Sequence, residues 1–320
     1  MAGHVTLEER EVLAQRRAAG ASMRMIAMEL DRNPSTISRE LRRNRSGNCY
    51  FPSKAQEEAA QRRRDRRLVR KMDQPEINGM VRKHLKEYWS PDQIAGRSKL
   101  LFANNRKCQI SRQSIYTWIH AQTLRGKKWT RYLRRYGKTR RGRENRGKLA
   151  DTTPIAGRPK IAERRGRLGD WEGDTVHGST RGGLLTLVDR KSRFLLMGQI
   201  DDLTAATVLD VAIDALHRVP RHARKTATFD NGKKFARHEE LSRRTGLAVY
   251  FARPYSAWQR GTNENTNGLI RQFYPKGTDL VRQARCRISQ VQDLLNHRPR
   301  RCLGYRTPHE AFTTIRPRCD

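Results

Sequence analysis

The sequence has few acidic residues and no long apolar run. Its 320 residues contain 32 Asp and Glu against 68 Lys and Arg, so the formal net charge is +36. A chain this basic repels itself unless an anionic partner neutralises it, and a polyphosphate backbone does so by releasing condensed counterions. Because no stretch approaches the roughly 18 apolar residues of a spanning helix, a membrane surface is the weaker alternative. We therefore expect a nucleic-acid-binding protein with no membrane partner and no small-molecule substrate.

Cysteine and histidine are too scattered to build a structural centre. The five cysteines form no C-x-x-C pair, and the nine histidines lack zinc-ligand spacing. Reduced thiols are typical of the cytoplasm, whereas disulfide frameworks are typical of secreted domains. The first twenty residues carry charges where a signal peptide would be apolar. These features predict a cytoplasmic, nucleoid-associated protein.

The first 46 residues have the pattern of a helix-turn-helix domain. Thr6, Ser22 and Asn33 stand where caps of three short helices would stand, and Glu9 completes a capping box with Thr6. The alternative is an ordinary small helical bundle. The basic run at the end of the third helix favours DNA binding.

The third helix of this domain is expected to read a DNA groove. Ile37 and Leu41, at i and i+4, anchor it inward. The side chains that then project outward, together with the following basic residues, are the DNA-binding candidates Ser35, Thr36, Ser38, Arg39, Arg42 and Arg43.

Three further segments precede the last domain. Residues 47–74 are expected to form a basic connector, and residues 75–122 a second helix-turn-helix-like domain with capping Ser90 and Ser111. Arg112 and Gln113, at the start of its last helix, are further DNA-binding candidates. Residues 123–166 form a basic linker, since 12 of the 24 positions from Arg125 to Lys148 are Lys or Arg. We expect that run to be a flexible linker that contacts phosphates along DNA. For the basic run at 61–67 in the connector, a solvated surface and direct phosphate contact remain the two alternatives.

Residues 167–320 have an alternating α/β pattern. Apolar and β-branched runs predict strands at 175–176, 184–188, 194–200, 226–229 and 248–251, with helices at 203–218, 233–245 and 258–274. This order is compatible with a mixed five-stranded sheet of ribonuclease H-like type. Several α/β folds share it, so the polar residues must decide between them.

Acidic residues cluster in this last domain. Strand alternation places Asp170, Glu172 and Asp174 on one face, Asp230 directly follows a strand, and Glu264 lies in the first half of a helix. Carboxylates of this kind bind Mg²⁺ or Mn²⁺, and two such ions about 4 Å apart promote phosphodiester displacement. Glu172 is an extra candidate ligand, with a salt bridge as the alternative. Each acid taken singly is more commonly a surface or capping residue.

At these residues the chain resembles the transposases of the bacterial insertion-sequence thirty family, a branch of the DDE transposases. The matching stretches span nearly the whole chain and comprise 22–27, 34–41, 169–174, 186–193, 229–233, 258–269, 274–279 and 296–300.

The resemblance implies a ribonuclease H-like catalytic domain in which Asp174, Asp230 and Glu264 are the catalytic and metal-binding triad. It also implies that the helix-turn-helix modules bind terminal inverted repeats, that the enzyme cleaves strands and joins them to target DNA, and that it assembles as a homodimer or larger oligomer. Lys233 and Arg260 are additional DNA-binding candidates, although Arg260 could instead pair with an acid.

Three positions depart from the family pattern. Two other functions remain as alternatives to a transposase. Lys234 and Arg253 stand where Glu and Asp are expected, and Ala257 where Pro is expected. A catalytically decayed, self-repressing DNA-binding protein is one alternative. A structure-specific nuclease with a ribonuclease H fold is the other.

Overall fold

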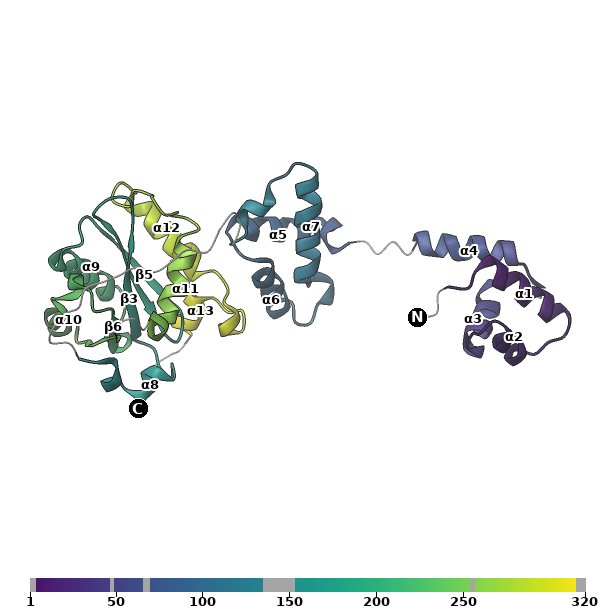
Figure 1. Ribbon diagram of the computed structural model, residues 1–320, viewed down its shortest axis with the longest axis horizontal. Coiled ribbons are helices and arrows are strands. Elements are labelled where there is room, and N and C mark those ends of the chain that lie inside the picture. Colours follow the sequence, from purple (N-terminus) through teal and green to yellow (C-terminus); the bar gives the residue numbers. More distant parts are fainter. Residues whose placement is uncertain (1–3, 47–48, 66–69, 135–152, 254–256, 315–320) are drawn as a thin grey trace. The chain divides into compact units, whose positions relative to one another are not determined.

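A computed structural model describes residues 4–46, 49–65, 70–134, 153–253 and 257–314 (Figure 1). Contacts divide the chain into two compact units, Met1–Arg70 and Lys71–Asp320. Within the first unit, helices α1 (Leu7–Ala18), α2 (Met23–Glu29) and α3 (Pro34–Asn44) are followed by the short strands β1 (Arg45–Ser46) and β2 (Cys49–Tyr50) and by helix α4 (Pro52–Asp65). The predicted three-helix domain is therefore present, with a fourth helix in the same unit.

The helix caps of the first unit follow the sequence prediction. The Thr6 hydroxyl accepts from the backbone N–H of Glu9 at 3.2 Å, and the Glu9 carboxylate accepts from the backbone N–H of Thr6 at 2.8 Å. Ser22 and Asn33 cap α2 and α3. These bonds satisfy backbone donors that the first helical turns leave unpaired.

The residues expected to act as a connector contribute to the packing of the first unit. Arg10 is buried on α1, where it donates to Glu40 at 2.6 Å, to the Val5 carbonyl at 2.7 Å and to Gln56 on α4. A buried arginine is stable only when its donors are satisfied, so α4 completes the unit beyond the expected boundary at residue 46.

The second unit begins with a helical segment. It contains η1 (Lys71–Asp73), α5 (Pro75–Lys86), α6 (Pro91–Leu101), η2 (Arg106–Cys108), α7 (Arg112–Leu124) and η3 (Trp129–Tyr132). Ser90 and Gln93 form the predicted capping box of α6, and Ser111 caps α7. Ile115 and Ile119 are fully buried among the apolar side chains of α5 and α6.

The helical segment packs against the C-terminal part of the chain. Gln93 donates to the Pro299 carbonyl at 2.7 Å and accepts from Arg298 at 2.9 Å. A Cβ atom on Gly96 would lie 2.3 Å from the ring of Tyr305, so only glycine permits this approach of α6. The segment and the α/β domain are therefore joined by direct side-chain contacts.

The α/β domain contains the predicted mixed five-stranded sheet. After η4 (Ile155–Gly157) and α8 (Lys160–Glu163), the strands are β3 (Asp170–His177), β4 (Gly183–Asp189), β5 (Leu195–Ile200), β6 (Thr226–Phe229) and β7 (Ala248–Phe251). Their order across the sheet is β5-β4-β3-β6-β7. Strands β3, β4 and β5 pair antiparallel, whereas β6 is parallel to β3 and β7 is parallel to β6.

Helices cover both faces of the sheet (Figure 1). One core lies against α9 (Ala205–His217) and α10 (His238–Thr245); the other lies against α11 (Gly261–Ile270) and α12 (Arg285–Asn296). Because both faces are buried, β4 is apolar along most of its length and all seven of its residues are buried. The chain also contains η5 (Arg221–Ala223), η8 (Arg301–Leu303) and α13 (Pro308–Thr313).

Two predicted helices are shorter than their sequence patterns indicated. The segment 233–245 divides into η6 (Lys233–Phe235) and α10, and the segment 258–274 divides into η7 (Ala257–Arg260) and α11. The pattern of apolar residues does not distinguish a 3₁₀ turn from the first turn of an α-helix, because the two periods differ little over four residues.

Candidate active site

Strand β3 lies at the centre of the sheet and carries three acids on alternate residues. Asp170 and Glu172 are fully buried, whereas the side chain of Asp174 is 17% exposed. A Cβ atom on Gly173 would lie 2.1 Å from the ring of Phe229, so glycine is needed where the strand faces the core. Of the three acids, Asp174 is the one that a bound molecule can reach.

The two buried acids have structural partners. Asp170 accepts from Arg167 at 3.1 Å and from the Thr226 hydroxyl at 2.8 Å. Glu172 forms an ion pair with Arg190 and accepts from the backbone N–H of Asn263 at 3.0 Å. Glu172 is therefore the salt-bridge partner that the sequence left as an alternative, and it fixes the first turn of α11 against the sheet.

Burial changes the pKa values of the arginines near these acids. Desolvation lowers the pKa of the Arg190 guanidinium, while the charge of Glu172 acts in the opposite direction. Burial also lowers the pKa of Arg158, and there too the charge of Glu172 acts in the opposite direction. Sequence reasoning missed both arginines, although Arg190 lies within the stretch 186–193 that carries the family resemblance.

Asp230 directly follows β6, next to the centre of the sheet. Its Oδ1 accepts from the backbone N–H of Gly232 at 3.2 Å, which closes a tight turn at Asn231-Gly232. Its side chain is 13% exposed. Because β3 and β6 are neighbouring strands, this turn brings Asp230 to the same part of the sheet as Asp174.

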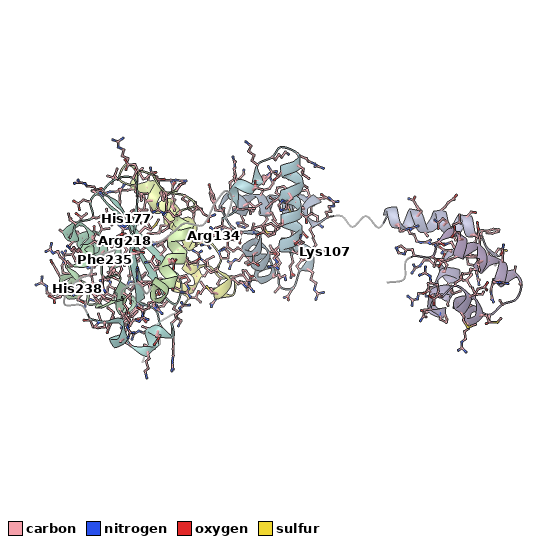
Figure 2. The ribbon with its side chains drawn as sticks, viewed as in Figure 1. Lys107, Arg134, His177, Arg218, Phe235 and His238 are labelled. Carbon is pink, nitrogen blue, oxygen red and sulfur yellow. The ribbon has the colours of Figure 1, made fainter. Side chains whose placement is uncertain are left out.

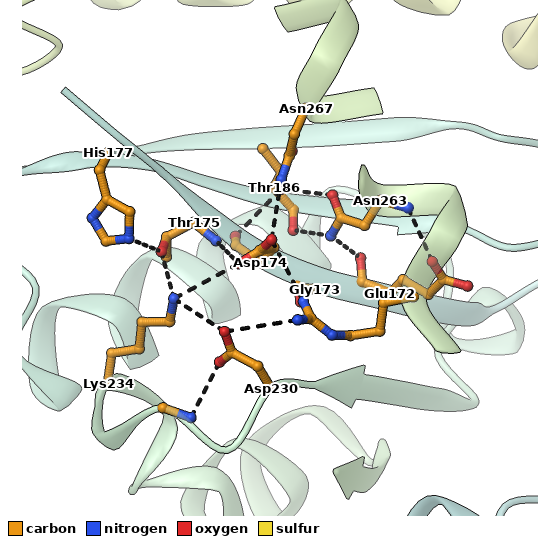
Figure 3. A network of polar contacts seen from close by, with 12 residues as sticks. Glu172, Gly173, Asp174, Thr175, His177, Thr186, Asp230, Lys234, Asn263 and Asn267 are labelled. Atoms are coloured by element: carbon orange, nitrogen blue, oxygen red, sulfur yellow. Dashed lines mark hydrogen bonds and ion pairs between the residues drawn. The ribbon is translucent and has the colours of Figure 1, made fainter. Parts of the chain in front are cut away.

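Two basic side chains link the carboxylates of Asp174 and Asp230 (Figure 3). Lys234 Nζ lies 3.7 Å from Asp174 Oδ1 and 3.6 Å from Asp230 Oδ2. Arg260 Nη1 lies 3.5 Å from Asp174 Oδ2, and Nη2 lies 3.8 Å from Asp230 Oδ2. Of the two roles considered for Arg260, the structure shows pairing with acids; its side chain is only 11% exposed.

Asparagines of α11 complete this polar network (Figure 3). Asn267 Nδ2 donates to Asp174 Oδ2 at 3.1 Å, and Asn263 Nδ2 donates to the Glu172 carbonyl at 2.9 Å. Thr186 on β4 donates to Asn263 Oδ1 at 3.0 Å. These contacts explain why residues with low helix propensity occur within a helix: Asn267 orients the Asp174 carboxylate, and Asn263 holds the backbone of β3 at Glu172.

Glu264 is placed differently from the two aspartates. It lies in the first turn of α11 and is exposed. Within the described residues, no group of three or more His, Cys, Asp or Glu side chains is arranged to hold a metal ion. The structure therefore brings Asp174 and Asp230 together around two basic side chains and leaves Glu264 outside that group.

The other DNA-binding candidates lie on accessible surfaces. On α3, Ile37 is fully buried, while Ser35, Ser38, Arg39, Arg42 and Arg43 are exposed and Thr36 is half-buried. Arg112 and Gln113 are exposed at the start of α7. Lys233 is exposed in η6, two residues before Phe235, which is labelled in Figure 2.

Two family models match this chain, one in its N-terminal helices and one over its sheet. Residues 3–44 match a helix-turn-helix domain, and residues 165–257 match an integrase core domain. The first match covers the helices α1 to α3, and the second covers the sheet that carries Asp174 and Asp230. The C-terminal domain is thus an integrase-like catalytic core of ribonuclease H-like fold, as predicted.

Similar proteins extend over almost the whole chain. The transposase for insertion sequence element IS4351 from Bacteroides fragilis is 38% identical over 98% of this chain and 97% of its own length. The transposase InsI for insertion sequence element IS30A from Escherichia coli K12 is 38% identical over 96% of this chain and 82% of its own length. The catalytic core domain of BIV integrase, a solved structure, is 21% identical over 46% of this chain and 96% of its own, with a TM-score of 0.36.

The chain belongs to the IS30 family of insertion-sequence transposases. Its helix-turn-helix domain and integrase core are those of a protein that binds DNA and cleaves and transfers its strands. Across the described residues, no helix is long and apolar enough to cross a membrane.

Proposed function

We propose that this protein is a DNA transposase that binds the terminal inverted repeats of its element, cleaves phosphodiester bonds there and joins the resulting 3′-OH ends to target DNA. The observation that carries the proposal is the convergence of Asp174 and Asp230 on adjacent central strands of an integrase core. Divalent ions bound at this acidic pair would make the local charge attractive to the phosphates of DNA.

The residues at this position fit a divalent ion such as Mg²⁺ or Mn²⁺. Asp174 and Asp230 provide hard oxygen donors, and both already lie within ion-pair distance of the same two cationic side chains. Glu264 would be the third carboxylate of the proposed triad. A pair of bound ions would supply activation of the attacking oxygen and stabilisation of the leaving oxygen.

The protein's own residues position the carboxylates. The Gly232 N–H holds Asp230 in its turn, and Asn267 orients Asp174. The Glu172 carboxylate holds the Asn263 backbone and so sets where α11 presents Glu264. Preorganisation of this kind matters because a small misplacement of a reacting group has a large effect on rate.

DNA recognition is assigned to the helical modules. The exposed residues of α3 suit the major groove, and Arg112 and Gln113 would add contacts from α7. Two element ends must be held together for joining, so we expect a homodimer or larger oligomer. Location in the cytoplasm at the nucleoid follows from the same role.

The proposal is tested by separating DNA binding from strand chemistry. Asp230→Asn removes a charge that a hard cation requires, so nicking and joining of end-bearing DNA should fall by about 10³-fold or more, at one decade per 1.4 kcal/mol, while binding of the ends persists. Asp174→Asn and Glu264→Gln should behave alike. Asp214→Asn, an exposed acid on α9, is the matched control for the charge change.

Three outcomes would contradict the proposal. An Asp230→Asn protein that still joined ends in Mg²⁺ would refute the triad. A wild-type protein that bound ends without cleaving them in Mg²⁺ or Mn²⁺ would instead be a decayed, self-repressing DNA-binding protein. Preferential cleavage of an RNA–DNA hybrid would make it a structure-specific nuclease.

A further inference from the structure

Lys234 stands out because its charged group lies between the two aspartates that are proposed to bind metal. Its Nζ is nearly equidistant from Asp174 Oδ1 and Asp230 Oδ2, at 3.7 and 3.6 Å. The side chain is 11% exposed. A lysine ammonium is a compact point charge, so in this position it satisfies both carboxylates as a small cation would.

The surroundings hold the ammonium in this position. Thr175 Oγ1 accepts from Nζ at 2.7 Å (Figure 3), and Nζ lies 5.1 Å from the centre of the Phe235 ring. The lysine follows Asp230 by four residues, within η6, so the Asp230 turn and the lysine are set by one short segment. The contact to Asp174 on β3 ties that segment to the centre of the sheet.

The balance of charges shows what Lys234 does to metal binding. Asp174 and Asp230 contribute two negative charges, and Lys234 and Arg260 contribute two positive charges at 3.5 to 3.8 Å. The group is therefore neutral before any ion arrives. A divalent cation that approaches the same oxygens meets a positive charge already within a few ångströms, and that repulsion is large where water is partly excluded.

We propose that Lys234 is a tethered cation that competes with the divalent ion for Asp174 and Asp230 and thereby weakens metal binding in the absence of DNA. The inference rests on the proposed metal site. Because the lysine side chain is flexible, its ammonium can leave the carboxylates when an ion binds, and a phosphate of bound DNA is then the counter-charge available to it. Metal loading and DNA binding thus favour each other.

The test measures metal affinity directly. Mn²⁺ is titrated into the full-length protein without DNA, and the free ion is followed by electron paramagnetic resonance. Lys234→Met keeps the length of the side chain and removes its charge, so Mn²⁺ affinity should rise by about tenfold or more. Lys234→Arg should stay within about threefold of wild type. Lys225→Met, at an exposed lysine before β6, changes the net charge equally and should leave the affinity unchanged.

A second measurement uses the unaltered protein. An amine-reactive reagent followed by mass spectrometry should modify Lys234 slowly without metal and severalfold faster in saturating Mn²⁺, because the ion releases the ammonium. The exposed Lys225 should show no such change. This result does not depend on the folding of any variant.

The failure of this inference is distinguishable from failure of the proposed function. If Asp230→Asn removes Mn²⁺ binding while Lys234→Met binds Mn²⁺ with the wild-type affinity, the tethered-cation inference is refuted and the metal site stands. The same conclusion follows if the rate at which Lys234 is labelled does not change when Mn²⁺ is added. If Asp230→Asn leaves Mn²⁺ binding intact, the metal site itself is refuted.

Discussion

The buried pair of Glu172 and Arg190 offers a quantitative test of how the active-site strand is held. The side chain of Glu172 is 1% exposed and that of Arg190 is 7% exposed. Replacing Glu172 by Gln keeps the shape and removes the charge, which leaves the guanidinium buried without its counter-ion. Removal of one partner of a buried pair destabilises a protein by about 3–5 kcal/mol.

The remaining hydrogen bonds of Arg190 place the expected destabilisation at the lower end of that range. The guanidinium also donates to the carbonyls of Ala162 at 3.0 Å and Glu163 at 3.4 Å, and those bonds survive the substitution. We therefore expect a destabilisation of about 3 kcal/mol. For a domain of this size, where each 1 kcal/mol shifts Tm by about 2–4 °C, Tm should fall by about 6–12 °C.

Thermal unfolding followed by circular dichroism and calorimetry measures this effect. Glu172→Gln combined with Arg190→Met removes both charges and should restore much of the stability, because the penalty arises from the unpaired charge. Asp214→Asn should change stability by no more than about 0.5 kcal/mol, as exposed substitutions usually do. A Glu172→Gln protein with the wild-type Tm, or a double variant less stable than the single one by a further 3 kcal/mol or so, would refute the reasoning.

Three further predictions concern DNA binding and the core. Arg39→Ala should weaken specific binding of the element ends by about 1–3 kcal/mol if Arg39 makes a bidentate base contact; unchanged protection in footprinting would remove Arg39 from the interface. The second change neutralises four residues of the basic linker, chosen among Arg134, Arg135, Arg140, Arg141 and Arg143; all but Arg134 lie outside the described residues. The slope of log DNA affinity against log salt concentration should then become shallower by about 0.9 for each phosphate contact that is lost. An unchanged slope would show that the linker faces solvent and does not contact DNA. Gly173→Ala should destabilise the catalytic domain by about 1–3 kcal/mol in denaturant unfolding, since its Cβ would lie 2.1 Å from Phe229; Gly79→Ala, with no atom within 4 Å of its Cβ, is the control and should not destabilise it.

One residue of the basic linker, Arg134, makes a hydrogen bond within the protein. Arg134 donates to Asn265 Oδ1 of α11 at 3.1 Å, and Figure 2 shows it beside that helix. Its substitution therefore changes a hydrogen bond within the protein as well as a charge, so the variant set should be compared with and without it. A slope that falls only when Arg134 is included would assign the effect to that hydrogen bond.

Much of this protein was determined by sequence signals that act over short distances. Thr6 with Glu9 and Ser90 with Gln93 predicted helix starts that the structure confirms, because a cap needs only residues three positions apart. The apolar runs predicted the five strands, since β4 and β6 are buried on both faces and β7 on one.

The family resemblance had already grouped Asp174 with Asp230, but the tertiary structure alone decided which acids of β3 are buried and what neutralises each of them. Asp170, Glu172 and Asp174 are equivalent in the sequence pattern. In the structure, Arg167 pairs with Asp170 and Arg190 pairs with Glu172, whereas Asp174 shares Lys234 with Asp230. In the sequence Lys234 is only a departure from a family pattern; its position between two carboxylates depends on how β3 and β6 pair. Electrostatic energy depends on distance in space and on local burial, and neither can be read from the positions of Asp174 and Asp230 along the chain.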